Sequence, residues 1–201
     1  KGGGWLDPVM AMRLLTASGI SIAAVRVAHT ADEAVQIAED IGWPVVMKGL
    51  GPTLLHKTEA GAVKLRLNDP AAVRGAYMDL TQTLGDRLER VLVQRMVAAG
   101  VEMVAGGLND PLLGPVIMAG TGGIFVELVG DTAFRMCPLT EPDAISLIEE
   151  LKGKVLLRGY RGAPVADESA FAALLLGLSQ LLHVCPEIEE MDLNPVMVLR
   201  K

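Results

Sequence analysis

The stretch VVMKGLGPTLLHKTEAGAV, residues 45–63, runs from an apolar segment through a Gly-Pro turn and a loop of small residues into another apolar segment. Its first part ends at Lys48, so the sequence predicts a buried strand with a cation at its end. His56 follows within the loop. A loop of small residues leaves an imidazole uncovered, which predicts a histidine able to meet a reacting group.

Both residues also have a purely structural explanation. A lysine at a strand end can bury its aliphatic stem and hold its ammonium group in water. A single histidine is more often structural than catalytic. Lys48 and His56 therefore point to chemistry only together with signals elsewhere in the chain.

Capping signals mark the helices of the first half. Asp7–Pro8 and Asp69–Pro70 each supply an N-cap followed by the residue best tolerated at the first helical position. Thr30 with Glu33 matches a capping box. We expect helices over 8–18, 30–42 and 69–84, and strands over 21–28, 43–48 and 61–67.

The second half begins with strand patterns that follow one another closely. Little helix separates them, so they predict a mainly antiparallel sheet. Two helices then precede a last strand. The expected strands are 90–97, 102–108, 114–120, 124–129 and 190–199, and the expected helices are 142–152 and 168–183.

These patterns predict an α/β protein of two lobes with a cleft between them. Residues 1–7 are expected to be a linker or an artificial end. Residues 8–90 should form the N-terminal lobe and residues 91–201 the C-terminal lobe, as a fragment or subunit of a larger protein.

Composition excludes several classes of function. The apolar run at 171–178 is much shorter than the roughly 20 residues of a membrane span. The net charge is −6 and the basic residues form no dense run, so the sequence favours neither nucleic acid nor membrane as a partner. Cys137 and Cys185 lack metal-ligand spacing, which predicts reduced thiols in a cytoplasmic protein.

The segment VQRMVAAGVE, residues 93–102, has the pattern of a strand, a hinge and a second strand. A hinge exposes backbone N–H and C=O groups, which can bind an adenine base. Glu102 on the far side is then a candidate for the ribose hydroxyls. A hairpin with an exposed glutamate explains the segment equally well. The candidate nucleotide-binding residues are Gln94, Arg95, Met96, Val97 and Glu102.

Two further segments suggest ligands for phosphate and metal. The amides of Gly122 and Gly123 in a glycine turn can hold an anion, although one such turn is weak evidence. In EMDLNP, residues 190–195, Asp192 and Asn194 alternate onto one face of a strand that Pro195 should end. Their oxygens suit Mg²⁺ bridging a polyphosphate. An Asx-type turn is the alternative.

The order of these signals resembles the ATP-grasp part of the nucleotide-diphosphate-forming acyl-CoA synthetases, the relatives of succinyl-CoA synthetase. The resemblance covers nearly the whole chain. It rests on LDP…LL…GI, A…IAEDIGWPVVMK, HKTEAGAV, GLNDPLLGPVIMAGTGG, FRMCPL and RGYRGAP.

This resemblance implies a role for each end of the opening stretch. The lysine at the position of Lys48 holds nucleotide phosphates. The histidine at the position of His56 carries a phosphoryl group on a swinging loop, between a histidine of the CoA-binding part and ADP. Neutral imidazole is nucleophilic near neutral pH, and the phosphoramidate that it forms is labile.

Two functions fit the resemblance. The first is the nucleotide-binding module of an ADP-forming acyl-CoA synthetase, which uses ATP or ADP with Mg²⁺ and needs a CoA-binding domain or α subunit as partner. The second is a regulatory domain of the same fold in a protein lysine acetyltransferase. The first is favoured because a sensor needs no phosphoryl carrier, whereas this chain retains all five candidate residues: Lys48, His56, Glu102, Asp192 and Asn194.

Overall fold

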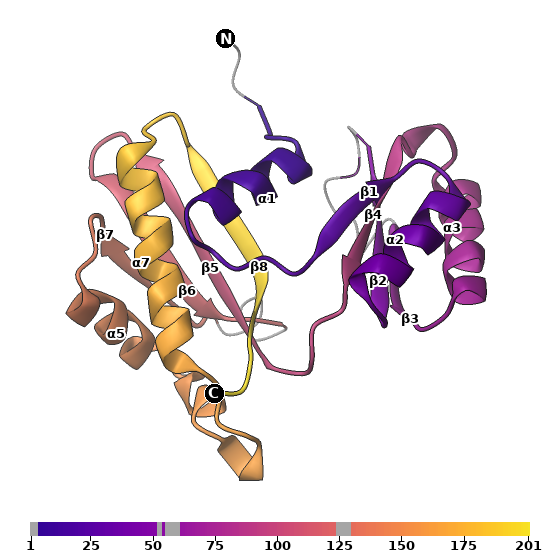
Figure 1. Ribbon diagram of the computed structural model, residues 1–201. Helices are drawn as coiled ribbons and strands as arrows, with labels where there is room; N and C mark the ends of the chain where they lie inside the picture. The colour runs from indigo at the N-terminus through magenta and orange to yellow at the C-terminus, as the bar shows by residue number, and fades with distance from the viewer. Residues whose placement is uncertain (1–3, 52–53, 55–60, 124–129) are drawn as a thin grey trace. The chain divides into compact units, whose positions relative to one another are not determined.

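The computed structural model describes residues 4–51, 54, 61–123 and 130–201. The chain divides into two compact units (Figure 1). The first unit comprises Lys1–Thr16 and Ser21–Val97, and the second comprises Ala17–Ile20 and Ala98–Lys201. Each unit has its own four-stranded antiparallel sheet, as the sequence predicts for the second half of the chain.

The sheet of the first unit has the strand order β1-β4-β2-β3. Helices α2 and α3 pack together, and α2 contacts β4 while α3 contacts β2. The elements are α1 (Pro8–Ala17), β1 (Val25–Ala28), α2 (Ala31–Ile41), β2 (Val45–Leu50), β3 (Val63–Leu67), α3 (Pro70–Leu84), η1 (Gly85–Arg87) and β4 (Arg90–Arg95).

The helices of this unit start where the capping signals place them. The Thr30 side chain accepts a hydrogen bond from the Glu33 amide, at 3.1 Å. The Asp69 carboxylate accepts one from the Ala72 amide, at 2.7 Å. Gly42 ends α2 with a φ of 87°, a conformation that glycine adopts at little cost. Local sequence therefore fixes the boundaries of α2 and α3.

The core of the first unit lies between its sheet and these two helices. Val45 and Met47 of β2 are fully buried in it, together with Val93 of β4 and Leu80 of α3. Side chains alternate along a strand, so Lys48 projects from the opposite face. The buried apolar residues of β2 thus hold a lysine on the face that the helices leave open.

Strand β4 belongs to the first unit, and the lobe boundary expected at residues 90/91 lies after Val97 instead. β4 pairs with β2 from Val45↔Arg95 to Leu50↔Arg90 and with β1 on its other side. It is therefore a central strand of the first sheet. Its neighbours are remote in the sequence, and periodicity within 90–97 contains no information about which sheet the strand joins.

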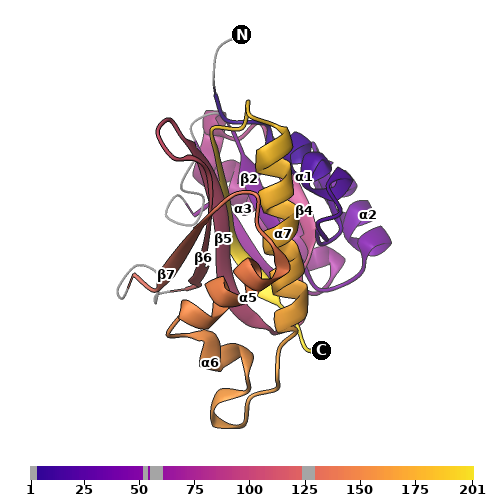
Figure 2. The ribbon, with the colours of Figure 1, turned by 90° about the vertical axis from the view of Figure 1, so that its left-hand side faces the viewer.

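The sheet of the second unit has the order β7-β6-β5-β8. Helices α5 and α7 lie on one face of it, as Figure 2 shows. The elements are β5 (Val101–Asp110), β6 (Gly114–Thr121), β7 (Thr132–Met136), α5 (Glu141–Glu150), α6 (Lys154–Leu157), η2 (Tyr160–Gly162), α7 (Glu168–Val184) and β8 (Glu190–Val198). The strand expected at 124–129 lies outside the described residues.

The last strand continues past Pro195, as the strand pattern over 190–199 predicts, so the expectation that Pro195 ends the ladder is wrong. β8 is an edge strand, and its pairing with β5 shifts register between Met103 and Ala105, opposite the Asn194–Pro195 step. A proline at a bulge on an edge strand removes no ladder hydrogen bond. The strand therefore continues to Val198.

Two further findings concern the composition. Among residues 4–51, 54, 61–123 and 130–201, no helix is long and apolar enough to cross a membrane. Cys137 and Cys185 form no disulfide, and their reduced state stays a prediction.

Candidate functional site

Lys48 is held on the open face of the first sheet by a neighbouring strand. Its Nζ donates a hydrogen bond to Oε1 of Gln94, at 2.9 Å. Gln94 lies opposite Val46 in the β2–β4 ladder, so its side chain is on the same face as Lys48. Two predicted nucleotide-binding residues are therefore in direct contact. A part-buried ammonium oriented in this way is suited to an anionic oxygen.

In the segment 93–102, which is expected to bind the adenine base, two backbone N–H groups already donate hydrogen bonds within the protein. The Arg95 N–H donates to the Ala24 carbonyl at 2.8 Å, and the Met96 N–H donates to the Pro44 carbonyl at 2.9 Å. These amides are part of the first unit's own hydrogen bonding. The prediction of exposed N–H groups is wrong at these two positions, because β4 is an inner strand that continues to Arg95.

Glu102 lies at the start of β5 with its side chain exposed. Gly122 follows the end of β6, and its N–H donates to the Glu102 carbonyl at 2.9 Å. A Cβ on Gly122 would lie 2.8 Å from the backbone of Glu102, and Gly123 has a φ of +66°. Only glycine suits this close approach. The structure thus brings three predicted site residues together.

These three residues line a cavity of about 500 Å³ within the second unit. The opposite wall comes from α6 and the 3-10 turn η2, which no sequence signal marked. The lining residues are Gly100, Val101, Glu102, Gly122, Gly123, Leu156, Tyr160 and Ala163. Its volume falls within the range typical of sites for small organic ligands.

A buried carboxylate, Asp131, joins the end of β6 to the segment before α6. It accepts hydrogen bonds from the hydroxyl of Thr121 and from the amides of Lys152 and Gly153, the last two at 2.8 Å each. Burial raises the pKa of Asp131, but these hydrogen bonds outweigh it and hold the pKa below its usual value. Asp131 is 7% exposed. Sequence analysis missed this residue.

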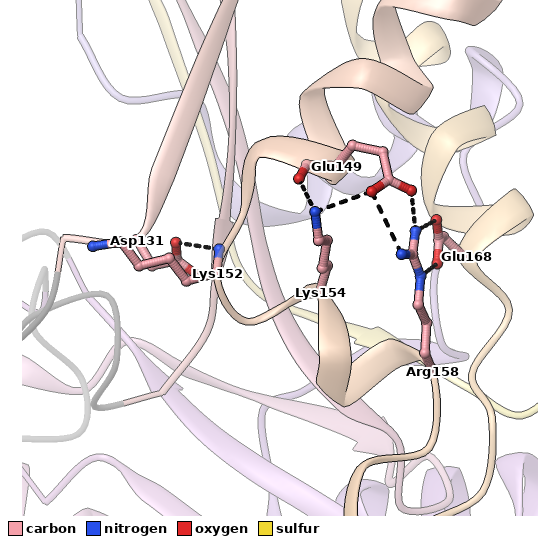
Figure 3. A network of polar contacts seen from close by, with 6 residues as sticks. All are labelled: Asp131, Glu149, Lys152, Lys154, Arg158 and Glu168. Atoms are coloured by element: carbon pink, nitrogen blue, oxygen red, sulfur yellow. Dashed lines mark hydrogen bonds and ion pairs between the residues drawn. The ribbon is translucent and has the colours of Figure 1, made fainter.

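Ion pairs hold α6 and η2 against the longer helices (Figure 3). Arg158 donates to both carboxylate oxygens of Glu168 at the start of α7, at 3.1 and 2.9 Å. It also pairs with Glu149 near the end of α5, and Lys154 lies 3.0 Å from the same carboxylate. Hydrogen bonds from Arg158 and then Lys154 lower the pKa of Glu149 to about 2.

Asp192 and Asn194 are both exposed on one face of β8, as the alternation predicts. Asp192 is paired with Gly106 of β5, whereas the next residue, Gly107, is turned toward Leu182 of α7. Asp192 therefore lies on the sheet face away from the helices. Glu102 has the same parity along β5 as Gly106, so its side chain shares this face.

The donor set of Asp192 and Asn194 fits a magnesium ion. Although Asp192 is exposed, the protein atoms around its carboxylate remove part of its hydration and raise its pKa, and the charge of Glu190 raises it further; a nearby cation would offset both effects. Within the described part of the chain, no group of three or more His, Cys, Asp or Glu residues is placed to hold a metal. Mg²⁺ needs no such cage, since it keeps waters and uses phosphate oxygens as ligands.

His56 lies outside the described residues, so its predicted role is not tested by the geometry. Leu54 and the residues that flank 52–60 are described. Leu54 is buried in the core of the first unit, and the Gly49 N–H donates to the Ala62 carbonyl at 2.8 Å. Ala62 therefore lies beside β2, the strand that carries Lys48.

Comparison with known proteins places this geometry in a family. A family model described as an ATP-grasp domain matches residues 1–201. The chain is 41% identical, over 98% of its length, to the ADP-forming acetate–CoA ligase I of Archaeoglobus fulgidus. It is also 36% identical, over 92% of its length, to the β subunit of the corresponding ligase I of Pyrococcus furiosus.

Solved structures of the same class of enzyme are also similar to this chain. The acetyl-coenzyme A synthetase 1 of Ca. Korarchaeum cryptofilum, in complex with coenzyme A and Ca-AMPCP, has a TM-score of 0.92 at 39% identity. The match covers 95% of this chain and 86% of that one. Another structure of the same synthetase contains Mg-AMPPCP, with a phosphohistidine segment that points towards the nucleotide binding site.

The chain therefore belongs to the ATP-grasp domain family, in the branch formed by ADP-forming acid–CoA ligases. This confirms the resemblance and the two-lobed α/β fold predicted from the sequence. The chain spans 82% of the Pyrococcus β subunit but 30% of the Archaeoglobus ligase. It corresponds to one part of the longer enzyme.

Proposed function

We propose that this chain is the nucleotide-binding, phosphoryl-carrying part of an ADP-forming acyl-CoA synthetase. The complete enzyme would convert acyl-CoA, ADP and phosphate into the acid, CoA and ATP. One observation carries the proposal: Glu102, Gly122 and Gly123 meet around one cavity, in a chain whose fold matches a synthetase solved with nucleotide and CoA. The reported relatives have ligase names, which favours this function over acetyltransferase regulation.

Each unit contains residues that we assign to a contact with the nucleotide. In the first, Lys48 neutralises phosphate charge, and Gln94 keeps its ammonium group oriented. In the second, Glu102 accepts hydrogen bonds from ribose hydroxyls, and the backbone amide of Gly123 donates to a phosphate oxygen. Arg95, Met96 and Val97 remain candidates for contacts with the base, through side chains or carbonyl groups.

Asp192 and Asn194 are the residues that would hold Mg²⁺. When bound, the ion would neutralise polyphosphate charge during phosphoryl transfer. The chain's own contribution is to place a carboxylate and an amide oxygen on the face of the sheet that also presents Glu102.

His56 would carry the phosphoryl group between two active centres. A ring nitrogen forms a bond to phosphorus as the bond from phosphorus to the donor breaks, and a terminal oxygen of ADP then displaces the histidine. The donor would be a phosphohistidine of the CoA-binding domain or α subunit, which is the partner that we propose. The cytoplasmic location of the complex stays a prediction.

Phosphate labelling of the complete enzyme tests this function. With acyl-CoA and labelled phosphate, the label should appear on His56 and move to ADP when ADP is added. A phosphoramidate survives at high pH and is hydrolysed in acid, so peptide mapping under basic conditions locates it. His56→Ala should remove the label from this chain, whereas the control His183→Ala on α7 should retain it.

The opposite result would overturn the carrier role. If the label reaches ADP in the His56→Ala enzyme, the phosphoryl group does not pass through this histidine. If neither the native enzyme nor the His183→Ala control is ever labelled on this chain, the regulatory function is favoured.

A further inference from the structure

The cavity of the second unit has two unlike walls. One is polar and consists of Glu102 with the backbone of Gly122 and Gly123. The other comes from the α6–η2 segment and presents the side chains of Leu156, Tyr160 and Ala163, together with Val101 of β5. A cavity with a carboxylate on one side and aromatic and aliphatic side chains on the other suits a nucleoside.

We propose that this cavity takes the nucleoside half of the nucleotide, with the ring of Tyr160 against the base and Glu102 toward the ribose. This inference rests on the proposed function and adds a base-contacting residue to it. Stacking on an aromatic ring tolerates any base, because every base has a π-face.

The local backbone makes Tyr160 part of the wall. Gly159 adopts a φ of +87°, and a Cβ there would lie 2.8 Å from the Ala163 carbonyl oxygen. The Ala163 N–H donates to the Tyr160 carbonyl at 3.1 Å, which closes the turn. Tyr160 is 51% exposed, so its ring has surface left to cover. The Arg161 guanidinium, 5.4 Å from the ring centroid, restrains the ring through a cation–π contact.

The wall is anchored at two points, before α6 and between α6 and η2. Before α6, Asp131 binds the amides of Lys152 and Gly153. Directly before the turn, Arg158 bridges Glu149 and Glu168, as Figure 3 shows. A contact surface that is already ordered loses less conformational entropy when a ligand binds. Arg158 is therefore a positioning residue for Tyr160 and does not itself touch the ligand.

Calorimetry with ADP and with pyrophosphate, each in the presence of Mg²⁺, separates the two halves of the nucleotide. Tyr160→Ala should weaken ADP binding about tenfold, the scale of base–aromatic stacking, and leave pyrophosphate binding unchanged. Tyr160→Phe should restore ADP binding. Phe134→Ala removes an aromatic side chain of similar exposure, 55%, that does not line the cavity, and should bind ADP as the native protein does.

Arg158→Ala provides the positioning test. It should weaken ADP binding less than Tyr160→Ala does, again without an effect on pyrophosphate binding. When Tyr160 is already alanine, adding Arg158→Ala should weaken ADP binding no further, because Arg158 acts through the tyrosine ring. A loss of pyrophosphate binding in Arg158→Ala would mean a general structural role and would contradict the positioning role.

Protection of the native protein gives a readout that needs no variant. Nitration of Tyr160, followed by peptide mapping, should be slowed by ADP and by adenosine but not by pyrophosphate, with Tyr77 as the internal reference. If native protein binds ADP but Tyr160 is nitrated at the same rate and Tyr160→Ala binds ADP equally well, the inference is wrong and the proposed function stands. If native protein binds neither ADP nor pyrophosphate, both fail.

Discussion

The two units share an architecture and differ in the charge that their open sheet faces present. Each has four antiparallel strands with helices on one face. The open face of the first carries an ammonium group, Lys48, held by Gln94. The open face of the second carries the carboxylates of Glu102 and Asp192. A magnesium nucleotide needs a cation for its phosphates and oxygen acceptors for its ribose and metal. The first sheet presents the cation, and the second presents the acceptors.

The largest effect is expected in the first unit. Lys48→Ala should weaken ADP binding by roughly 1.5–3 kcal/mol, or about 10- to 100-fold, because a charge-assisted contact to phosphate is lost. Gln94→Ala leaves the ammonium in place without its oriented acceptor and should cost clearly less. Calorimetry with ADP compares the two variants. Equal losses would indicate that Lys48 contributes structure and not phosphate binding.

The second prediction concerns Asp131, the buried carboxylate of the second unit. Asp131→Asn should lower the free energy of unfolding by about 1–3 kcal/mol, because a neutral amide cannot accept all the hydrogen bonds that the carboxylate accepts. Asp110→Asn is the matched control, since its carboxylate accepts hydrogen bonds from the amides of Leu112 and Leu113 in a more exposed turn. Denaturant titration should show a clearly smaller loss for the control.

A smaller effect is expected for the ribose contact. Glu102→Ala should weaken ADP binding by about 1 kcal/mol, or roughly fivefold, which is the net contribution of an ordinary hydrogen bond. The loss should be smaller for 2′-deoxy-ADP than for ADP, because fewer ribose hydroxyls remain to be bound. A loss as large as that of Lys48→Ala would contradict the ribose role of Glu102.

The smallest effect is a pH dependence of stability. The pKa of Glu149 is lowered from 4.5 to about 2, so its ion pairs stabilise the fold above the unfolded-state value and are lost as the pH falls from 4.5 towards 2. Glu149→Gln should therefore flatten the decline of thermal stability in this range. Glu39→Gln, an exposed glutamate of α2, serves as control and should leave the decline unchanged.

The helices were predicted well because the residues that start and end a helix are neighbours in the sequence. The Thr30 and Asp69 caps place α2 and α3 where they occur, and alternation places Asp192 and Asn194 on one face. The strand expected over 21–28 forms only at Val25–Ala28, where β4 provides a partner. Strand length and sheet membership depend on pairing partners that a single segment does not specify.

The missed part of the site has a common physical cause. Asp131, Arg158 and Tyr160 act through contacts with residues distant in the sequence or through a wall opposite the predicted residues. The segment RGYRGAP supported the family resemblance but gave no sign of what Tyr160 faces. A proline likewise predicts the end of a strand until the structure shows that Pro195 lies at a bulge on an edge.

Calorimetry with ADP in the presence and absence of Mg²⁺ tests the central claim most directly. The account predicts that ADP binds to this chain and that Mg²⁺ tightens binding in the native protein. Asp192→Ala should lose the tightening but retain binding without the ion, because Lys48 is unchanged. Absence of ADP binding up to millimolar concentration with Mg²⁺ present, or the same magnesium effect in Asp192→Ala, would contradict the account.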